Sequence, residues 1–494
     1  MTATKEEKES ELLLPKSNNG DKPRYSILRA RISAAFIPVF AVSVSGTRES
    51  LVTQYIVKRL EDEIGFSNVT KVSSCIDSGN SSNTESGNDP QSQASEQLTY
   101  YVLAQTIPAF FACLLLGSYA DYVGRRLLLL VPVFTNFVKT AIICCIVKFN
   151  FDLSYFYLAY GIDGLAGTSY SILLALYSFT ADISYSKKDR TFWIYAVSCA
   201  SSTMSAVINV TGGYLIKNYG FFEAAIFLCG LTLLSFIVPL IFLPETLQQR
   251  RSIKGVSPLT HIKNIFGLYF LDGTVRRRAT FCVCLLMFIV GVANDLHLNS
   301  LDSLYQMHYP FCWDSVKIGN YSAIRTAGGH FLAIIVYKLL QMCMAIEPIG
   351  MIGATFQGGA FVLEAFINAS WQFYLVPVIL IPSCLTSSVM RTMFSILAGP
   401  DHQGAVFSSI AVFETLCSLA TSQIYNRIYS ATVSFMPGAV YLVMASVSCV
   451  TVALFGVYFL VREKPQHVKI IVVDTLADKE NIQKTNSFLS KSVS

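Results

Sequence analysis

Long uncharged runs recur along the whole chain, and they limit its possible folds more strongly than any other feature of the sequence. Each run is close to the roughly 20 apolar residues that a helix needs to cross a bilayer. Only 14% of the 494 residues are charged, whereas soluble globular domains carry about 25%. The sequence therefore predicts an all-α membrane protein with many transmembrane helices.

Twelve of these runs are interpreted as membrane-spanning helices. They cover residues 31–57, 98–118, 127–149, 153–181, 191–215, 222–243, 279–303, 318–343, 348–368, 373–398, 404–429 and 435–461. Six runs precede a long basic segment and six follow it, which is the two-bundle plan of facilitator transporters. The prediction is therefore twelve transmembrane helices in two six-helix bundles.

The polar segments between the runs give the predicted domain boundaries. The chain divides into an N-terminal tail at 1–30, a first bundle at 31–243, a central linker at 244–278, a second bundle at 279–461 and a C-terminal tail at 462–494. Within the first bundle, residues 61–97 are rich in Ser, Asn, Gly and Asp and are predicted to form a long loop.

The placement of basic residues predicts the orientation. Lys and Arg gather in the N-terminal tail, the second-to-third link, the fourth-to-fifth link, the central linker and the C-terminal tail. Cytosolic loops carry an excess of Lys and Arg, so both termini and the central linker are predicted to be cytosolic. The N-terminus has no charged-then-apolar signal peptide. The segments 61–97 and 304–317 then lie outside the cytosol.

These two outer segments carry candidate modification sites. Asn68 and Asn80 begin Asn-x-Ser/Thr sequons and are predicted to be glycosylated. Cys75 and Cys312 would share an oxidising compartment and could form a disulfide, although two free thiols are the alternative. Most other cysteines lie in apolar runs, where a thiol behaves as a small hydrophobe. No Cys/His array is present, so neither a metal nor a cofactor is expected.

Residues 117–126, between the second and third runs, resemble the signature of the major facilitator superfamily, Gly-x-x-x-Asp-x-x-Gly-Arg-Arg/Lys. Gly117 and Gly124 would let backbones approach closely, and Asp121 could pair with Arg125 and face a neighbouring helix N-terminus. Such a latch would hold one conformation and release in another. The alternative is a basic cytosolic turn without a latch.

Four further segments resemble solute carrier family 46, which includes the proton-coupled folate transporter. They are Val52-Thr-Gln-Tyr55 with Arg59, Ala181-Asp182-Ile-Ser184 with Arg190, Pro310-Phe-Cys312-Trp-Asp314, and Gln403-Gly-Ala-Val-Phe-Ser408. The matches span most of the chain in the right order. The resemblance implies the facilitator fold and transport of a small organic substrate together with protons.

The resemblance also implies roles for single residues. The outer disulfide of the family maps onto the two loop cysteines, and Arg391 falls on an arginine associated with substrate and proton coupling. Three positions depart from the folate transporter: Thr168 and Ser198 stand where it has acidic residues, and Asp295 stands where it has a histidine. The departures leave the substrate open.

The seventh run carries a polar stripe at helical spacing, formed by Asp295, Asn299, Asp302 and Gln306, which predicts a cavity wall. A charge near the bilayer midplane costs about 2.5–3.5 kcal/mol, so retained charges usually have a function. His297 lies at similar depth on another face and is predicted either to titrate or to bond a backbone carbonyl. The proton-coupling candidates are Asp295, His297, Asp302, Glu364 and Glu414.

Arg48, Arg391 and Arg325 are predicted to bind an anionic substrate, because guanidinium groups form bidentate bonds to carboxylates and phosphates. Arg48 and Glu49 could instead be purely structural. Lys139 is interpreted as a side chain that snorkels to the interface.

The predicted function is proton-coupled symport of a small organic anion such as folate. The alternatives are lysosomal export of muropeptides or cyclic dinucleotides, and a substrate-sensing receptor on a transporter fold. No spaced metal set or Ser/His/Asp grouping points to an enzyme. The expected partners are an organic anion, protons and the lipid bilayer, and no nucleic acid. The sequence is compatible with the plasma membrane and with an endosomal or lysosomal membrane. The second is included because residues 9–14 resemble an acidic dileucine sorting signal. The sequence does not determine the oligomeric state.

Overall fold

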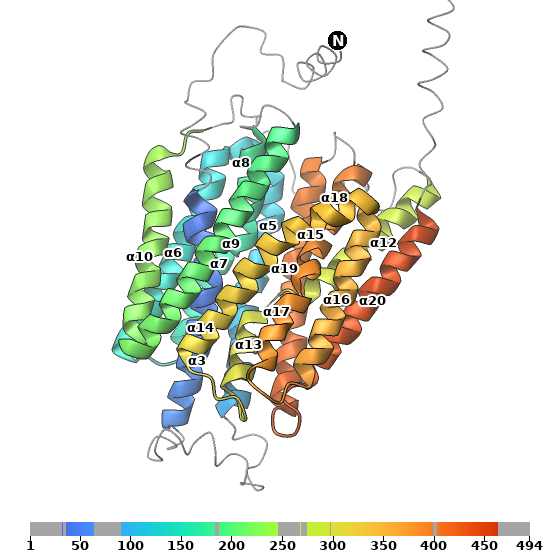
Figure 1. Cartoon of the computed structure of the whole chain (residues 1–494). Coiled ribbons are helices and arrows are strands. Elements are labelled where there is room, and N and C mark those ends of the chain that lie inside the picture. The colour runs from blue at the N-terminus through green and yellow to red at the C-terminus, as the bar shows by residue number, and fades with distance from the viewer. Residues whose placement is uncertain are drawn as a thin grey trace, which may run out of the picture.

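The computed structural model describes residues 36–63, 90–182, 187–245, 274–296, 298–398 and 403–462, together with residues 32 and 267. The described part of the chain is helical, with no strand. Figure 1 shows the helices of the first half packed beside those of the second half, all roughly along one direction. This arrangement confirms the predicted all-α membrane architecture.

Helices occur in each predicted run of the first half. They are a π-helical turn, Pro38–Val42, followed by α3 (Val44–Glu63), α5 (Pro90–Val123), α6 (Arg125–Phe149), α7 (Tyr155–Leu165), α8 (Thr168–Asp182), α9 (Lys187–Asn218) and α10 (Phe221–Phe242). Helix α5 begins at Pro90 rather than near 98, so it includes residues that the sequence assigned to the 61–97 loop.

The second half contains α12 (Val275–Ala293), α13 (Leu298–Met307), α14 (Ser315–Ala323), a π-helical turn at Ile324–Gly328, α15 (Gly329–Cys343) and α16 (Ile346–Ala365). These are followed by short turns at Gln372–Leu375 and Ile381–Ser383 on either side of α17 (Val376–Ile379), then by α18 (Cys384–Ala398), α19 (Gln403–Thr432) and α20 (Ala439–Val461). Among the described residues, seven helical segments are long and apolar enough to span a membrane.

The seventh run is broken rather than continuous, which corrects the predicted helix over 279–303. Helix α12 ends at Ala293 and α13 begins at Leu298. The break is held by Asn294, whose amide donates to Met444 O (3.1 Å) and Ser448 Oγ (2.9 Å) in α20 and whose oxygen accepts from Tyr425 (2.9 Å). Interrupted helices are tolerated in membranes where neighbouring helices satisfy the freed backbone groups.

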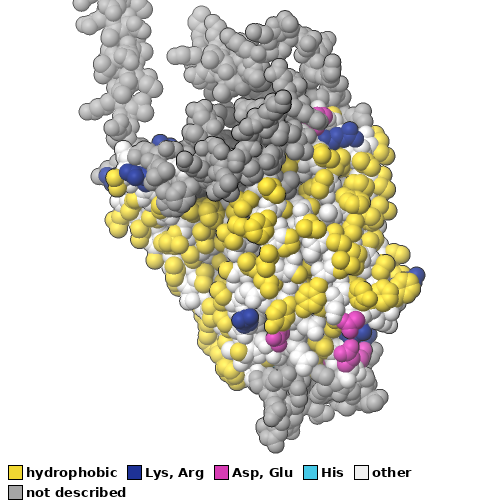
Figure 2. Space-filling model, turned by 180° about the vertical axis from the view of Figure 1, so that it is seen from behind, with side chains coloured by type: hydrophobic (Ala, Val, Ile, Leu, Met, Phe, Trp, Pro, Cys, Tyr) yellow, Lys and Arg dark blue, Asp and Glu magenta, His cyan; other side chains and the backbone are white. Residues whose placement is uncertain are grey.

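The two ends of the molecule differ in their charges. We call the end at which α3 stops and α5 starts the loop end, and the opposite end, which carries Arg125, Arg126, Arg276 and Arg462, the basic end. Figure 2 shows apolar side chains over the flank between the ends, with charged side chains concentrated near both. An apolar belt of this kind matches a lipid-facing surface.

At the loop end the two halves meet closely, where α9 crosses α14. A Cβ added to Gly213 would lie 2.5 Å from the carbonyl oxygen of Ser315, and one added to Gly319 would lie 2.5 Å from that of Asn209. The two glycines therefore permit backbone-to-backbone contact that another residue would prevent. Gln54 in α3 strengthens the contact by accepting a hydrogen bond from Ser315 (2.6 Å).

Polar contacts continue along α5 and α19, which run side by side (Figure 1). Ser92 and Ser430 share a hydrogen bond of 2.6 Å, and Ser95 donates to Asn426 O (2.9 Å). The loop end is thus closed by small and polar side chains from both halves. These contacts are short and involve few atoms, which suits an interface that has to separate and re-form.

An ion pair between Lys217 and Asp314 (2.6 Å) also joins the halves at the loop end. Partial burial raises the pKa of Asp314, but the hydrogen bonds from the Lys217 ammonium and the Lys317 amide outweigh it, so the pKa lies below its usual value. A carboxyl with a lowered pKa contributes stability above its usual pKa of about 3.9 and loses it only as the pH falls further. The pair therefore stays ionised at any physiological pH.

We expect Asp314→Asn to reduce uptake by the same modest factor at about pH 5.5 and about pH 7.5, because the removed carboxylate does not titrate between these values. Asparagine still caps α14, since it can accept the bond that Lys317 N gives to Asp314 (3.0 Å). Initial uptake rates at both pH values measure the effect. A variant whose uptake no longer depends on pH would contradict this account of the ion pair.

Candidate functional site

Three charged side chains of the second half meet in its interior. Asp302 comes from α13, Arg325 from the π-helical turn and Glu364 from α16. Arg325 donates to Asp302 Oδ2, and its Nη1 lies 3.7 Å from Glu364 Oε1. A π-helical turn shifts one residue of a helix out of register and is frequent at functional sites; here it carries the arginine to both carboxylates. We call these residues the C-half triad.

The two carboxylates of the C-half triad are held differently. Asp302 accepts hydrogen bonds from Arg325 and from the Tyr441 hydroxyl (3.0 Å). Glu364 is completely buried, and neither of its carboxyl oxygens has a hydrogen-bond partner. One guanidinium thus faces two carboxyl groups, so the triad carries a net negative charge when both are ionised. A buried, unbonded carboxylate is costly, and a proton on Glu364 would remove that cost.

Aromatic side chains cover the C-half triad. Tyr305 lies 5.2 Å from Tyr441 and 5.7 Å from Phe373, and Phe373 also contacts Phe311 (4.8 Å) and Trp313 (4.7 Å) between ring centroids. All five rings are buried. They keep water from the charges, and electrostatic interactions are stronger where water is excluded.

The first half contains a second buried charged group, which we call the N-half cluster. Glu49 in α3 forms an ion pair with Lys139 in α6 (3.0 Å), and Lys139 also lies 3.7 Å from Asp163 in α7. Arg48 donates to the side chains of Asn136 and Thr140 and lies 3.8 Å from Glu49. Two cations therefore balance two carboxylates in the N-half cluster.

Lys139 does not snorkel, which corrects the sequence interpretation. Its side chain is completely buried, and its ammonium lies 3.7 Å from the centre of the Tyr160 ring. The Tyr160 hydroxyl donates to Glu49, and Gln105 donates to Asp163 (2.7 Å). Lys139 lies near the middle of α6, with acids from two other helices within reach, and this prevents it from extending to the interface.

Asp295 and Arg391 lie apart from both groups. Asp295 follows the end of α12, is exposed, and accepts a hydrogen bond from Gln357 (3.0 Å). Arg391 in α18 forms an ion pair with Glu414 in α19. Both Arg325 and Arg391 act electrostatically on Asp295. An exposed carboxylate at a helix break, within electrostatic reach of two arginines, is suited to meet a solute or a proton.

The polar stripe predicted for the seventh run divides at the helix break. Asp295 and Asn299 are exposed, whereas Asp302 and Gln306 are buried within the second half. The stripe is therefore not one continuous cavity wall, because its two parts lie on either side of the helix break and differ in burial.

The structure pairs each predicted substrate-binding arginine with its own neighbours. Arg48 lies in the N-half cluster, Arg325 in the C-half triad, and Arg391 beside Glu414. They do not form one group. Sequence reasoning did not name Lys139 or Asp163 as site residues; an ionisable residue in the middle of an apolar run was the signal that could have found both.

Several predicted site residues lie outside the described residues: His297, Cys75, Asn68 and Asn80, as does the side chain of Ser198. Cys312 is exposed and is not a free thiol. Its pairing with Cys75 stays a prediction.

The latch segment is described in part. Gly117 and Asp121 lie in α5, with side-chain positions outside the described set, and Gly124 has a positive φ of 102° between α5 and α6. The Arg125 amide donates to Glu245 (2.9 Å). A carboxylate thus sits at the N-terminus of α6, where helix dipoles favour negative charge.

Thr168 is the first residue of α8, directly after the break that follows α7, and it has a positive φ of 59° and a buried side chain. Nearby, Gly164 lies against the backbone carbonyl of Gln105 and leaves no room for a Cβ. This glycine therefore permits close helix packing.

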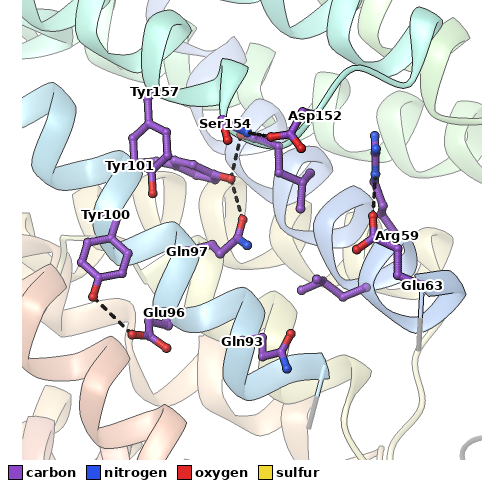
Figure 3. Close-up of a pocket in the computed structure, with 12 residues that line it drawn as sticks. Arg59, Glu63, Gln93, Glu96, Gln97, Tyr100, Tyr101, Asp152, Ser154 and Tyr157 are labelled. Atoms are coloured by element: carbon purple, nitrogen blue, oxygen red, sulfur yellow. Dashed lines mark hydrogen bonds and ion pairs between the residues drawn. The ribbon is translucent and has the colours of Figure 1, made fainter. Parts of the chain in front are cut away.

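A cavity of about 460 Å³ opens at the loop end between α3, α5 and the start of α7 (Figure 3). Figure 3 shows that its polar side chains largely satisfy one another: Tyr101 points to Gln97, Tyr100 to Glu96 and Arg59 to Glu63. The two buried charged groups do not line this cavity. The cavity is therefore separate from the C-half triad and the N-half cluster.

Comparison with known proteins gives consistent results. Residues 85–422 match the family model described as Major Facilitator Superfamily. The proton-coupled folate transporter of Rattus norvegicus is 26% identical over 431 residues, covering 87% of this chain and 92% of that protein. The lysosomal proton-coupled steroid conjugate and bile acid symporter SLC46A3 of Rattus norvegicus is 25% identical over 404 residues, covering 80% and 87%. Both relatives confirm the predicted resemblance to solute carrier family 46.

Solved structures show the same fold at low identity. An auto-inhibited peptide transporter of the POT family superposes with a TM-score of 0.64 at 12% identity, covering 89% of this chain and 98% of the other. The nucleoside transporter NupG superposes with a TM-score of 0.61 at 13% identity, covering 87% and 100%. These likenesses concern the fold alone.

Proposed function

The chain belongs to the major facilitator superfamily, and from this premise we propose that it carries a small organic anion together with protons by alternating access between its two halves. It is a transporter and not an enzyme. The coupling residues, the cargo, the membrane and the cytosolic placement of both termini are parts of the proposal. The C-half triad, in which one arginine faces two buried carboxyl groups, is the observation that supports proton coupling most directly.

Glu364 is the proton carrier in this proposal. Asp302 already accepts two hydrogen bonds, which favour its charged form, whereas the Glu364 carboxyl accepts none. Uptake of a proton by Glu364 neutralises the triad and leaves Arg325 bound to Asp302 alone. Loss of the proton restores a second negative charge beside Arg325 and attracts the guanidinium.

This exchange links protonation to conformation, because Arg325 lies on a helix that crosses α9 of the other half. The crossing of α14 and α9 closes the loop end, and the π-helical turn follows α14 directly. A change in the position of Arg325 is transmitted along this helix to the crossing. The structure described here represents the conformation that is closed at the loop end.

The proposed cargo is an organic anion of the size of folate or a steroid conjugate. The relatives named above transport folate, and steroid conjugates or bile acids, with protons. Asp295 is exposed, lies within electrostatic reach of Arg325 and Arg391, and offers a first contact for a solute with both charged and polar groups. One relative is lysosomal by name, so an endosomal or lysosomal membrane is as consistent with the proposal as the plasma membrane.

Uptake into proteoliposomes tests the proposal. Purified protein is reconstituted, and labelled folate, a steroid sulfate and a bile acid are offered outside at about pH 5.5 or about pH 7.5, with the interior held at the higher value. We expect at least one anion to accumulate against its gradient only when the pH gradient is present. Uptake that is unaffected by collapse of the gradient with a protonophore would refute proton coupling, and binding without flux would favour a receptor.

The variant Glu364→Gln is expected to lose most of its pH dependence, because glutamine imitates the protonated carboxyl. Uphill uptake should fall by about tenfold or more, which corresponds to a loss of at least about 1.4 kcal/mol, because the coupling proton has no other carrier in this proposal. Exchange of labelled for unlabelled substrate, which needs no net proton movement, should continue.

Glu347→Gln is the matched control for this variant, because it makes the same change in the same helix at the basic end, where Glu347 pairs with Arg462 (2.7 Å). It should retain the wild-type pH profile. Equal loss of uphill uptake and exchange in Glu364→Gln, with the pH profile unchanged, would assign the proton to another residue.

A further inference from the structure

We propose that Asp295 is a specificity-determining residue of the cargo site: its carboxylate accepts hydrogen bonds from a cargo group that presents two neighbouring N–H donors, such as the edge of an amino-substituted pyrimidine ring. Gln357 positions the carboxylate for this contact. The inference rests on the proposed function and deepens it, because it names a chemical group that the cargo carries in addition to its negative charge.

Asp295 lies at the boundary between the two halves, near the middle of the molecule. It follows the end of α12, and Asn299, in the first turn of α13, contacts α3 of the first half: a Cβ added to Gly46 would be 3.0 Å from Asn299 Nδ2. Helix α13 continues from there toward the closed loop end. Asp295 therefore lies on the side of this contact that faces the basic end.

The exposure of Asp295 and Asn299 indicates what these residues face. Both are exposed, although they lie at a depth where an ionised side chain in contact with lipid is strongly disfavoured. Ionisable residues at such depth face the interior of a helix bundle or a water-filled space. We therefore place both residues in the space between the halves that opens toward the basic end, where a cargo can reach them.

Asp295 differs from the acids of the C-half triad and the N-half cluster because it forms no ion pair within the described part of the chain. Arg325 and Arg391 act on it electrostatically, but Arg325 is bound to the acids of the triad and Arg391 to Glu414. A carboxylate that is retained at this depth without a bound cation is expected to have a function. Contact with the cargo supplies the missing partner.

Gln357 holds one oxygen of this carboxylate and leaves room for further donors. Its Nε2 donates to Asp295 Oδ1 (3.0 Å), and the residue is only 2% exposed, so its side chain is fixed by packing. A carboxylate offers about four acceptor positions on its two oxygens, and no other described side chain donates to this one. Two parallel N–H groups of a cargo can therefore bind both oxygens, the bidentate geometry that carboxylates favour.

The charge of Asp295 decides which cargo benefits from the site. A cargo whose polar groups are all negative is repelled by the carboxylate, whereas a cargo with an N–H edge at one end and a negative group at the other can use Asp295 and an arginine together. Of the three test compounds named above, folate has such an edge, formed by a ring N–H and the 2-amino group. Steroid sulfates and bile acids have none. A site built to bind an N–H group discriminates strongly against a compound that lacks it, because its acceptor then stays unpaired.

Equilibrium binding to purified protein tests the inference separately from transport. The affinity for folate is compared at about pH 7.5 with that for an analogue in which a methyl group replaces the 2-amino group, so that one of the two donors is lost. Wild type should bind folate about tenfold or more tightly than the analogue. Asp295→Asn should bind the two within about twofold of each other, because its amide cannot accept two parallel N–H bonds. Its affinity for a steroid sulfate should not fall.

Gln357→Met tests the positioning role. Methionine is similar in length and apolar, which suits a residue that is 2% exposed, but it cannot hold the Asp295 carboxylate. The preference for folate over the analogue should fall by about threefold or more, with the affinity for the steroid sulfate unchanged. The ratio of two affinities does not depend on the fraction of folded protein in a preparation, so a loss of stability alone cannot produce this result.

Asp152→Asn is the matched control, because it makes the same change at the loop end. Asp152 accepts the Ser154 amide there (2.8 Å), and asparagine can do so as well. This variant should keep the wild-type ratio of affinities. Wild type that does not bind folate, or that binds folate and the analogue equally, overturns the inference, and so does an unchanged ratio in Asp295→Asn. Discrimination as expected in the absence of uphill uptake would instead refute the transport proposal alone.

Discussion

Replacing Arg325 by methionine is expected to abolish uphill uptake and to destabilise the protein by roughly 3–5 kcal/mol, because both carboxyl groups of the C-half triad then lose the cation that faces them. Methionine is long and apolar, so it fills most of the space but cannot pair. Asp302 is 7% exposed and Glu364 0% exposed as side chains, so water cannot compensate. Thermal unfolding of purified protein and proteoliposome uptake measure the two effects.

Two comparisons make this prediction specific. Arg462→Met is the matched control, since Arg462 pairs with Glu347 at the basic end and is 35% exposed; it should change stability little. The double variant Arg325→Met with Asp302→Asn should recover stability without recovering uptake, because Glu364 can be protonated and no buried charge remains. Normal uptake in Arg325→Met would contradict any role of the triad in coupling.

Replacing Gly213 and Gly319 by alanine is expected to prevent closure of the loop end. Each new Cβ would lie 2.5 Å from a backbone carbonyl oxygen, and backbone cannot move aside as a side chain can. Overpacking of this kind costs roughly 1–3 kcal/mol per site, enough to shift a two-state equilibrium by about 5- to 150-fold. Uptake should fall accordingly, while the folded structure of each half is preserved.

Spin labels near the ends of α9 and α14 measure closure directly. Tyr219 and Lys317 are exposed and flank the crossing, and labels attached through a non-canonical amino acid avoid the 13 cysteines of the chain. The glycine variants should show a longer label-to-label distance than wild type. Gly328→Ala, where an added Cβ meets nothing within 4 Å, is the control and should leave the distance unchanged. An unchanged distance in the glycine variants would show that the crossing is not what closes this end.

The sequence was sufficient for the class of protein and the location of its helices. A membrane-spanning helix can be recognised in the amino-acid sequence as an apolar run of about the length of a bilayer span, because lipid requires both apolar side chains and a helical backbone. The resemblance to solute carrier family 46 followed from short segments in the right order. The ends of the helices, such as the start of α5 at Pro90, were less well predicted, since polar residues can extend a helix beyond its apolar run into water.

The site was predicted only in part. Arg325, Asp302 and Glu364 were all named, because an ionisable residue inside an apolar run is visible from the sequence. The sequence did not predict that these three residues lie together, since Arg325 was assigned to a substrate site with Arg48 and Arg391. The three residues lie on three separate helical segments. The π-helical turn that places Arg325 beside the two carboxyl groups has no clear signature in the amino-acid sequence. The prediction for Lys139 was wrong for a related reason. Its burial depends on Glu49 and Asp163, which lie 90 positions before it and 24 positions after it along the chain.

What the amino-acid sequence determined by itself was therefore the membrane environment, the helical content and the presence of charges that must be compensated. The tertiary structure decided which charges compensate one another. A buried charge is stabilised by partners within a few ångströms, and those partners come from helices whose depth and rotation are set by packing, as the contact of Gly46 with Asn299 and of Gly213 with Ser315 shows. Pairing is thus a property of helix register, which only the folded chain possesses.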